Sequence, residues 1–156
     1  MSMLDRLRSF FRRKPQLPEP LVLRYQAESF KRATPGSAGF DLRVAHTTDV
    51  GRHTKVPLDA RVAIPPGHVG LILPRSSAAL KRNIEVVTGT IDSDYRGQLS
   101  AVMSFKHVHG GLTTVRAGEA LCQLVIIPLS PIVPLERPVY SHETERGTDG
   151  FGSTGG

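Results

Sequence analysis

Seven short runs of β-branched or alternating apolar residues follow one another along most of this chain, and Gly, Pro, Asn or Asp separates most of them. Runs of this length and composition are typical of β-strands, whereas Gly and Pro are typical of the turns between strands. The runs cover residues 21–25, 40–45, 56–64, 69–73, 84–87, 98–105 and 120–127. Within this stretch only residues 76–82 favour a helix, of at most two turns. The pattern predicts an all-β sandwich or barrel.

The N-terminal residues have a different character. Apolar side chains recur at spacings of three and four in residues 1–14, which predicts a short amphipathic helix. Three prolines in residues 15–20 end any helix and make a stiff linker, so we place a domain boundary at residue 20. Residues 1–14 hold five basic side chains against the single acid Asp5, so four of the six net positive charges lie there. The nearly neutral body argues against stable nucleic-acid binding.

Length and cysteine usage limit the class of protein. A chain of 156 residues is long enough for one domain with a hydrophobic core. Its single cysteine, Cys122, allows no intrachain disulfide, and the histidines show no zinc-ligand spacing. We therefore expect a cytoplasmic protein, or one of the host cytoplasm or nucleus if the source is viral. The basic N-terminal helix also fits contact with a membrane surface or an unknown partner, an organelle-targeting peptide, or a featureless extension.

Two polar segments flank expected strands near the middle of the chain. Residues 38–43 (AGFDLR) place Asp41 inside an alternating strand, where Asp is disfavoured, although a turn at the strand edge explains it equally well. Residues 74–78 (PRSSA) follow an apolar strand and open the expected helix. Ser76 or Ser77 as an N-cap is the favoured interpretation, and an anion site with Arg75 is the alternative.

Two further segments hold polar groups next to apolar strands. In residues 88–97 (TGTIDSDYRG), Asp92 and Asp94 share one side of the chain if it is extended. A carboxylate there could act as a general base on water, which contributes about 10²–10⁴ in rate, but a polar hairpin is the simpler interpretation. In residues 118–124 (GEALCQL), Gln123 lies among aliphatic residues and needs a hydrogen-bond partner, for which a backbone group is favoured.

The fifth segment, residues 146–155 (RGTDGFGSTG), is rich in glycine. Its Arg, hydroxyls and glycines match a phosphate-binding loop in composition, and its Phe could stack on a base. The Walker spacing with its Lys is absent, so the segment alone is weak support for a phosphate site.

Taken in order, the five segments resemble the five motifs of the homotrimeric dUTP pyrophosphatase (dUTPase) family, across residues 21–155. The resemblance implies a Mg²⁺-dependent homotrimer of jelly-roll subunits with three active sites between subunits. It also implies hydrolysis of dUTP to dUMP and pyrophosphate by attack of water on the α-phosphate. That reaction keeps uracil out of DNA and supplies dUMP for dTMP synthesis. Residues 21–145 would form the barrel domain, and residues 146–156 a flexible lid over a neighbouring subunit's site.

The resemblance also assigns roles to individual residues. Asp92 would deprotonate the attacking water, and Asp41 would bind Mg²⁺ through metal-bound water. A hairpin at residues 84–91 would read uracil through its backbone, and Tyr95 would pack under the deoxyribose. The implied substrate-binding residues are Arg75, Ser76, Ser77, Gly89, Thr90, Ile91, Tyr95, Gln123, Arg146, Phe151, Gly152, Ser153 and Thr154.

Three positions depart from the family pattern: Ser77 replaces a usual Gly, and Ala120 and Cys122 are also unusual. We expect Cys122 to be a small buried hydrophobic residue and not a nucleophile. A dCTP deaminase of the same fold is one rival, but it carries a different third motif and a catalytic Glu, and residues 98–105 hold no acid. A non-catalytic protein that kept the fold is the other, and it is expected to have lost motif residues such as Asp92.

Overall fold

The expectation of an all-β fold with one short helix is confirmed by a computed structural model, which describes residues 22–107, 109–134 and 136. The calls for residues 1–20 and for residues 146–156 lie outside the described residues. The elements are β1 (Arg24–Gln26), β2 (Phe40–Arg43), β3 (Thr48–Val50), β4 (Thr54–Pro57), β5 (Arg61–Ala63), β6 (His68–Pro74), α2 (Ser76–Arg82), β7 (Ile84–Val86), β8 (Gly89–Ile91), β9 (Ser100–Phe105), β10 (Thr113–Val115) and β11 (Ala120–Pro128). No helix in these residues is long and apolar enough to cross a membrane.

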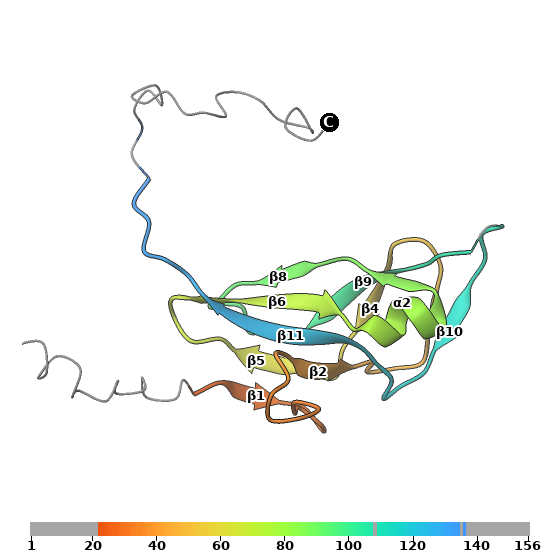
Figure 1. Cartoon of the computed structure of the whole chain (residues 1–156), viewed down its shortest axis with the longest axis horizontal. Helices are drawn as coiled ribbons and strands as arrows, with labels where there is room; N and C mark the ends of the chain where they lie inside the picture. Colours follow the sequence, from red (N-terminus) through yellow and green to blue (C-terminus); the bar gives the residue numbers. More distant parts are fainter. Residues whose placement is uncertain (1–21, 108, 135, 137–156) are drawn as a thin grey trace, which may run out of the picture.

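The strands form a jelly-roll-like sandwich (Figure 1). One sheet has the order β2-β11-β6-β8 and another has the order β4-β9-β7, while β1 pairs with β5 and β3 with β10. Every one of these ladders is antiparallel. Because β11 lies between β2 and β6, the last strand joins two strands that are far apart in sequence, and its residues reach the middle of the larger sheet.

The core consists of aliphatic side chains that point inward from both larger sheets. Leu42, Ile72 and Leu124 come from the four-stranded sheet, and Val56 and Met103 come from the three-stranded one, each at most 1% exposed. In β11 the pairing register shifts between Ala120 and Cys122, which is a β-bulge. After the bulge, Cys122 and Leu124 are buried while Gln123 stays partly exposed. The alternation in the sequence therefore places Gln123 away from the core.

Residues 56–64 are not the single strand that their composition predicted. β4 ends at Pro57, and the backbone N–H of Leu58 then donates to the carbonyl of Leu99. β4 pairs with β9, but β5 pairs with β1, so the chain leaves one sheet and joins another within four residues. The interruption falls at Pro57 and Asp59, and both residue types are disfavoured inside strands, so the sequence did carry a signal for the break although not for the change of partner.

The hairpin expected at residues 84–91 is also wrong. β7 pairs with β9, whereas β8 pairs with β6, so the two strands belong to different sheets and the chain crosses between them at residues 87–88. β3 and β10 were missed, because strands of three residues are too short to show an alternating pattern.

Candidate active site

Three of the predicted site residues meet at one end of the larger sheet. Asp41 on β2 lies directly across the ladder from Gln123 on β11, and Arg75 follows the last residue of β6. The Arg75 Nη1 atom is 3.2 Å from Asp41 Oδ2, in an ion pair that is partly shielded from solvent. Gln123 Nε2 donates to the carbonyl of Pro74 at 3.3 Å, so the favoured backbone partner is confirmed. We call Asp41, Arg75 and Gln123, with the adjoining Ser76 and Ser77, the arginine cluster.

Backbone contacts hold the arginine cluster in place. The N–H of Arg75 donates to the carbonyl of Leu121 at 3.0 Å, and its Nη1 also lies 3.4 Å from the carbonyl oxygen of Ala120. A Cβ atom at the buried Gly39 would lie 2.7 Å from Gln123 Oε1, so only glycine leaves space for that amide. A guanidinium fixed at one nitrogen, and 32% exposed, retains N–H groups that could bind phosphate oxygens.

The expected serine N-cap is wrong. α2 begins at Ser76, and its N-cap is Arg75, whose backbone is extended and whose side chain makes no capping hydrogen bond. The backbone of Arg75 is bound to Leu121 at the end of the sheet, and this contact fixes where the helix begins. Ser76 is exposed and Ser77 is half-buried.

A second group of predicted residues lines a cavity of about 260 Å³ beside β8. Thr90, Ile91, Asp92 and Tyr95 contribute to its wall, and Gly89 begins the same strand. Asp92 is exposed, and Tyr95 is 43% exposed. Lys55, Gln98, Leu99 and Ser100 complete the lining. We call Gly89, Thr90, Ile91, Asp92 and Tyr95 the aspartate cluster.

Asp92 and Asp94 do not share one side of an extended chain. After β8 the chain turns, and the N–H of Tyr95 donates to the carbonyl of Asp92 at 3.2 Å. Asp and Ser favour turns over strand continuation, and this preference prevails here. Arg96 Nη1 donates to the carbonyls of Ser93 and Tyr95 at 2.7 and 2.8 Å, so this guanidinium stabilises the turn. Asp92 lines the cavity, and Asp94 does not.

Lys55 is a residue of this cavity that sequence reasoning missed. It is exposed on β4, between the half-buried Thr54 and the buried Val56. An outward-facing Lys in an alternating strand is the usual pattern of a solvated surface, so the sequence carried no signal for its place beside Asp92.

Asp92 and Arg75 lie beyond opposite ends of the β6–β8 ladder. Ile91 pairs with Gly70, and Arg75 follows five residues further along the chain from Gly70. At about 3.3 Å per residue, Asp92 is therefore roughly 16 Å or more from Arg75. A general base must be within hydrogen-bond reach of the attacking water. Asp92 and Arg75 of one chain thus cannot act together on one phosphate.

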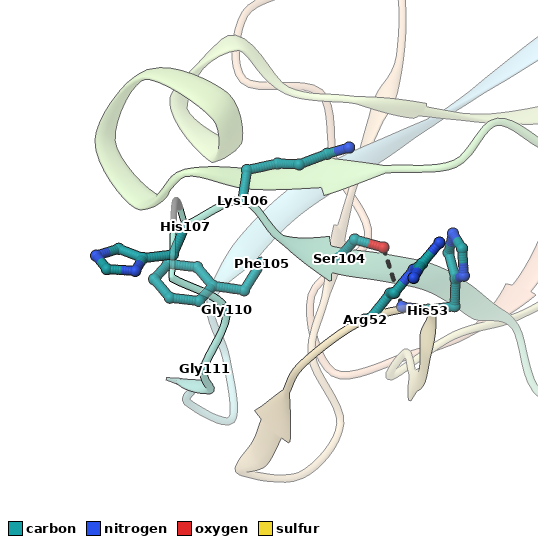
Figure 2. Close-up of a pocket in the computed structure, with 8 residues that line it drawn as sticks. All are labelled: Arg52, His53, Ser104, Phe105, Lys106, His107, Gly110 and Gly111. Carbon is teal, nitrogen blue, oxygen red and sulfur yellow. Dashed lines mark hydrogen bonds between the residues drawn. The ribbon is translucent and has the colours of Figure 1, made fainter.

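A larger cavity, of about 630 Å³, lies elsewhere and contains none of the motif residues (Figure 2). Its basic side chains do not all converge, since the His107 ring points away from Arg52 and His53 (Figure 2). Lys106 Nζ is paired with Glu85 Oε2 at 2.7 Å, and the His107 ring stacks on Phe105. We therefore do not assign the active site to this cavity.

The residues that could hold a metal ion are few. The described part of the chain contains no group of three or more His, Cys, Asp or Glu side chains arranged to bind one. Asp41 is the carboxylate of the arginine cluster, and its side chain is 14% exposed. Mg²⁺ keeps several waters and is often held through one carboxylate together with substrate phosphates. The cluster therefore fits a water-mediated contact and not a dense cage.

Cys122 lies directly beneath the arginine cluster and is fully buried, as expected. Burial raises the pKa of its thiol from 9.0 to about 12, while Arg75 lowers this pKa and Asp41 raises it. The thiolate is the reactive form of cysteine, so this side chain is inert at neutral pH.

Comparison with known proteins identifies the family. The model of the dUTPase family matches residues 25–155. The chain is 39% identical over 132 residues to the deoxyuridine 5'-triphosphate nucleotidohydrolase of Cutibacterium acnes, across 79% of this chain and 82% of that one. It is 41% identical over 127 residues to the mitochondrial enzyme of that name from Dictyostelium discoideum, across 80% and 69% of the two chains.

A solved structure leads to the same assignment. A mutant dUTPase of Staphylococcus bacteriophage 80alpha, solved with dUpNHpp, superimposes with a TM-score of 0.76 at 26% identity, covering 87% of this chain and 99% of that one. The protein belongs to the dUTPase family. The predicted residues Arg146, Phe151, Gly152, Ser153 and Thr154 lie outside the described residues, so the geometry above concerns the other predicted positions.

Proposed function

We propose that the protein hydrolyses dUTP to dUMP and pyrophosphate with Mg²⁺, which keeps uracil out of DNA and supplies dUMP for dTMP synthesis. The observation that supports this most is the presence of both clusters in one chain. The aspartate cluster places a carboxylate and an aromatic ring in one cavity, and the arginine cluster supplies a partly exposed guanidinium. Family membership and the dUTP analogue bound by the phage relative agree with this reaction.

In the proposed reaction, Asp92 accepts a proton from a water molecule, and the water oxygen attacks the α-phosphorus. The bond between that phosphorus and the α–β bridging oxygen breaks, and pyrophosphate leaves. Arg75 and Gln123, with Ser76 and Ser77, bind the phosphates and hold them for this displacement. Asp41 would hold Mg²⁺ through water, and the ion would supply positive charge that favours binding of the phosphates.

Recognition of uracil is assigned to the edge of the larger sheet. Among the described strands, β8 pairs with β6 alone, so along its other edge alternate residues of Gly89–Ile91 present backbone groups that no described strand pairs. These N–H and C=O groups can pair with the polar edge of a base as a further strand would. The ring of Tyr95, in the adjoining cavity, packs under the deoxyribose and leaves no room for a 2′-hydroxyl.

We further propose that the active form is a homotrimer, in which the arginine cluster of one subunit faces the aspartate cluster of another. The separation of the clusters within one chain supports this arrangement. A second support is the segment after β11, which leads away from the body (Figure 1) and exposes Leu129, Ile132 and Val133 by 56%, 81% and 89%. Apolar side chains exposed in this way are typical of an interface.

Residues 146–156 are proposed as a lid over a neighbouring subunit's site. In this proposal Phe151 stacks on uracil, while Arg146, Gly152, Ser153 and Thr154 bind the γ-phosphate. We also propose residues 1–20 as an extension that the reaction does not need, with the body acting in the cytoplasm. A fluorescent fusion with and without residues 1–20 tests whether the extension directs the protein to an organelle or a membrane instead.

A panel of dUTP, UTP, dCTP and dTTP, each with Mg²⁺, tests the reaction. We expect rapid release of pyrophosphate from dUTP alone, with dUMP as the nucleoside product and no turnover after chelation of Mg²⁺. Deamination of dCTP would favour the rival deaminase, which the absence of an acid from β9 (SAVMSF) argues against. A folded protein that turns over none of these nucleotides would refute the proposal and favour a non-catalytic role.

A further inference from the structure

The ring of Tyr95 lies directly over the backbone of Gly97. A Cβ atom at position 97 would lie 2.2 Å from the Tyr95 hydroxyl oxygen, 2.4 Å from Cζ and 3.0 Å from Cε2. These separations are far below the ordinary carbon contact distance of about 3.5 Å. The φ angle of Gly97 is not in the left-handed region. A side chain at this position would therefore force the Tyr95 ring to move, and the effect comes from the space that Gly97 leaves and not from its backbone conformation.

The next residue fixes the outer end of the same ring. The Tyr95 hydroxyl donates a hydrogen bond to the backbone carbonyl of Gln98 at 3.0 Å. Gln98 is itself held, because its Nε2 atom donates to the carbonyl of Leu58 at 3.1 Å. The bare backbone of Gly97 and the carbonyl of Gln98 thus form a platform for Tyr95, which we call the tyrosine seat.

We propose that Gly97 and the carbonyl of Gln98 are positioning groups that set the depth of the Tyr95 ring, and through it the selectivity for deoxyribose over ribose. This inference rests on the proposed function, in which Tyr95 packs under the sugar. A steric barrier to a 2′-hydroxyl works only if the ring cannot retreat, and the seat fixes its height. A side chain at position 97 lifts the ring and breaks the hydrogen bond to Gln98.

A double-mutant cycle of Gly97→Ala and Tyr95→Ala tests the seat. For each variant, kcat/KM is measured for dUTP and for UTP, and the ratio of the two gives the selectivity. We expect Gly97→Ala to narrow the ratio by roughly tenfold, the size of effect that small changes in pocket shape produce. In the Tyr95→Ala background, Gly97→Ala should change the ratio no further, because the ring that it displaces is gone.

Gly36→Ala is the matched control. A Cβ atom at Gly36 would meet no atom within 4 Å, and its φ angle is also outside the left-handed region. This variant should keep the wild-type ratio. A folded Gly97→Ala variant that keeps the wild-type ratio of kcat/KM for dUTP to that for UTP would overturn the seat. The seat would also be overturned if the double variant showed the full sum of the two single changes in this ratio.

Melting temperatures of the same four proteins provide a second readout that needs no substrate. Gly97→Ala should lower the melting temperature in the Tyr95 background and have little effect in the Tyr95→Ala background. An equal decrease in melting temperature in both backgrounds would mean that the clash does not involve the Tyr95 ring, and would overturn the inference. Since this cycle uses no dUTP, it tests the seat even if the wild-type protein fails to hydrolyse dUTP, an outcome that would instead refute the proposed function.

Discussion

At the scale of single residues, the reaction depends most on Asp92, which lines the cavity beside β8 while Asp94 does not. Asn at position 92 keeps the size and one acceptor but cannot accept the proton. We expect Asp92→Asn to lower kcat by about 10²–10⁴ with little change in the affinity for a non-hydrolysable dUTP analogue. Steady-state kinetics and calorimetry measure the two effects. Asp94→Asn, the control, should show milder damage to rate and stability, and a kcat above about a tenth of wild type in Asp92→Asn would place the base elsewhere.

The buried Cys122 leads to a prediction about how the stability of the folded protein depends on pH. Its thiol has a pKa of about 12 in the folded protein against 9.0 when free of these surroundings, mainly because it is buried. A raised folded-state pKa favours the protonated form, so this contribution to stability is complete below pH 9 and is lost as the pH rises toward 12. Chemical denaturation at pH 7.5 and at pH 10.5 should therefore show a smaller alkaline loss in Cys122→Ala than in wild type. An equal loss of stability between the two pH values in wild type and in Cys122→Ala would contradict the burial of an ionisable thiol.

At the scale of elements, the C-terminal residues 147–156 should be separable from the folded body. The buried core of the described residues ends at Leu124 in β11, so folding has no need of this segment. We expect its deletion to leave an unchanged melting temperature and oligomeric state, while dUTP turnover becomes very slow because the proposed lid is lost. Deleting residues 1–20, which precede β1, is the control and should leave the rate unchanged. A truncated protein with near wild-type turnover would show that the segment is not a lid.

The elements also show what the sequence could predict and what it could not. Alternation predicted β6 and β11 to within a residue or so, because both are long strands whose inward residues are aliphatic. The division of residues 56–64 depends on pairing with β9 and β1, partners that are distant in sequence. The resemblance to the dUTPase motifs predicted Arg75 and Asp92 as site residues, whereas residue chemistry alone left simpler interpretations open, and local sequence carries no information on the strand register that separates the two residues.

At the scale of the whole molecule, the separation of the two clusters predicts that activity requires assembly. Light scattering should show a trimer, and dilution that yields monomers should abolish turnover, because no single chain can bring Asp92 to the phosphates at Arg75. The exposed side chains at Leu129, Ile132 and Val133 should become protected from solvent in the trimer. A stable monomer with full activity would contradict both the assembly and the shared site.

The sharpest test of a shared site is complementation between two inactive variants. Asp92→Asn lacks the base and Arg75→Ala lacks the phosphate-binding cation, so each homotrimer should be nearly inactive. If a site takes its arginine cluster from one subunit and its aspartate cluster from another, then unfolding and refolding the two variants together creates sites in which both residues are intact. With random mixing of equal amounts, about a quarter of the sites should be complete, and about a quarter of wild-type kcat should return. Mixing without unfolding is the control and should restore nothing while the trimers stay intact. If both clusters of a site came from one chain, every site in the mixture would lack one of the two residues, and no activity would return at any ratio.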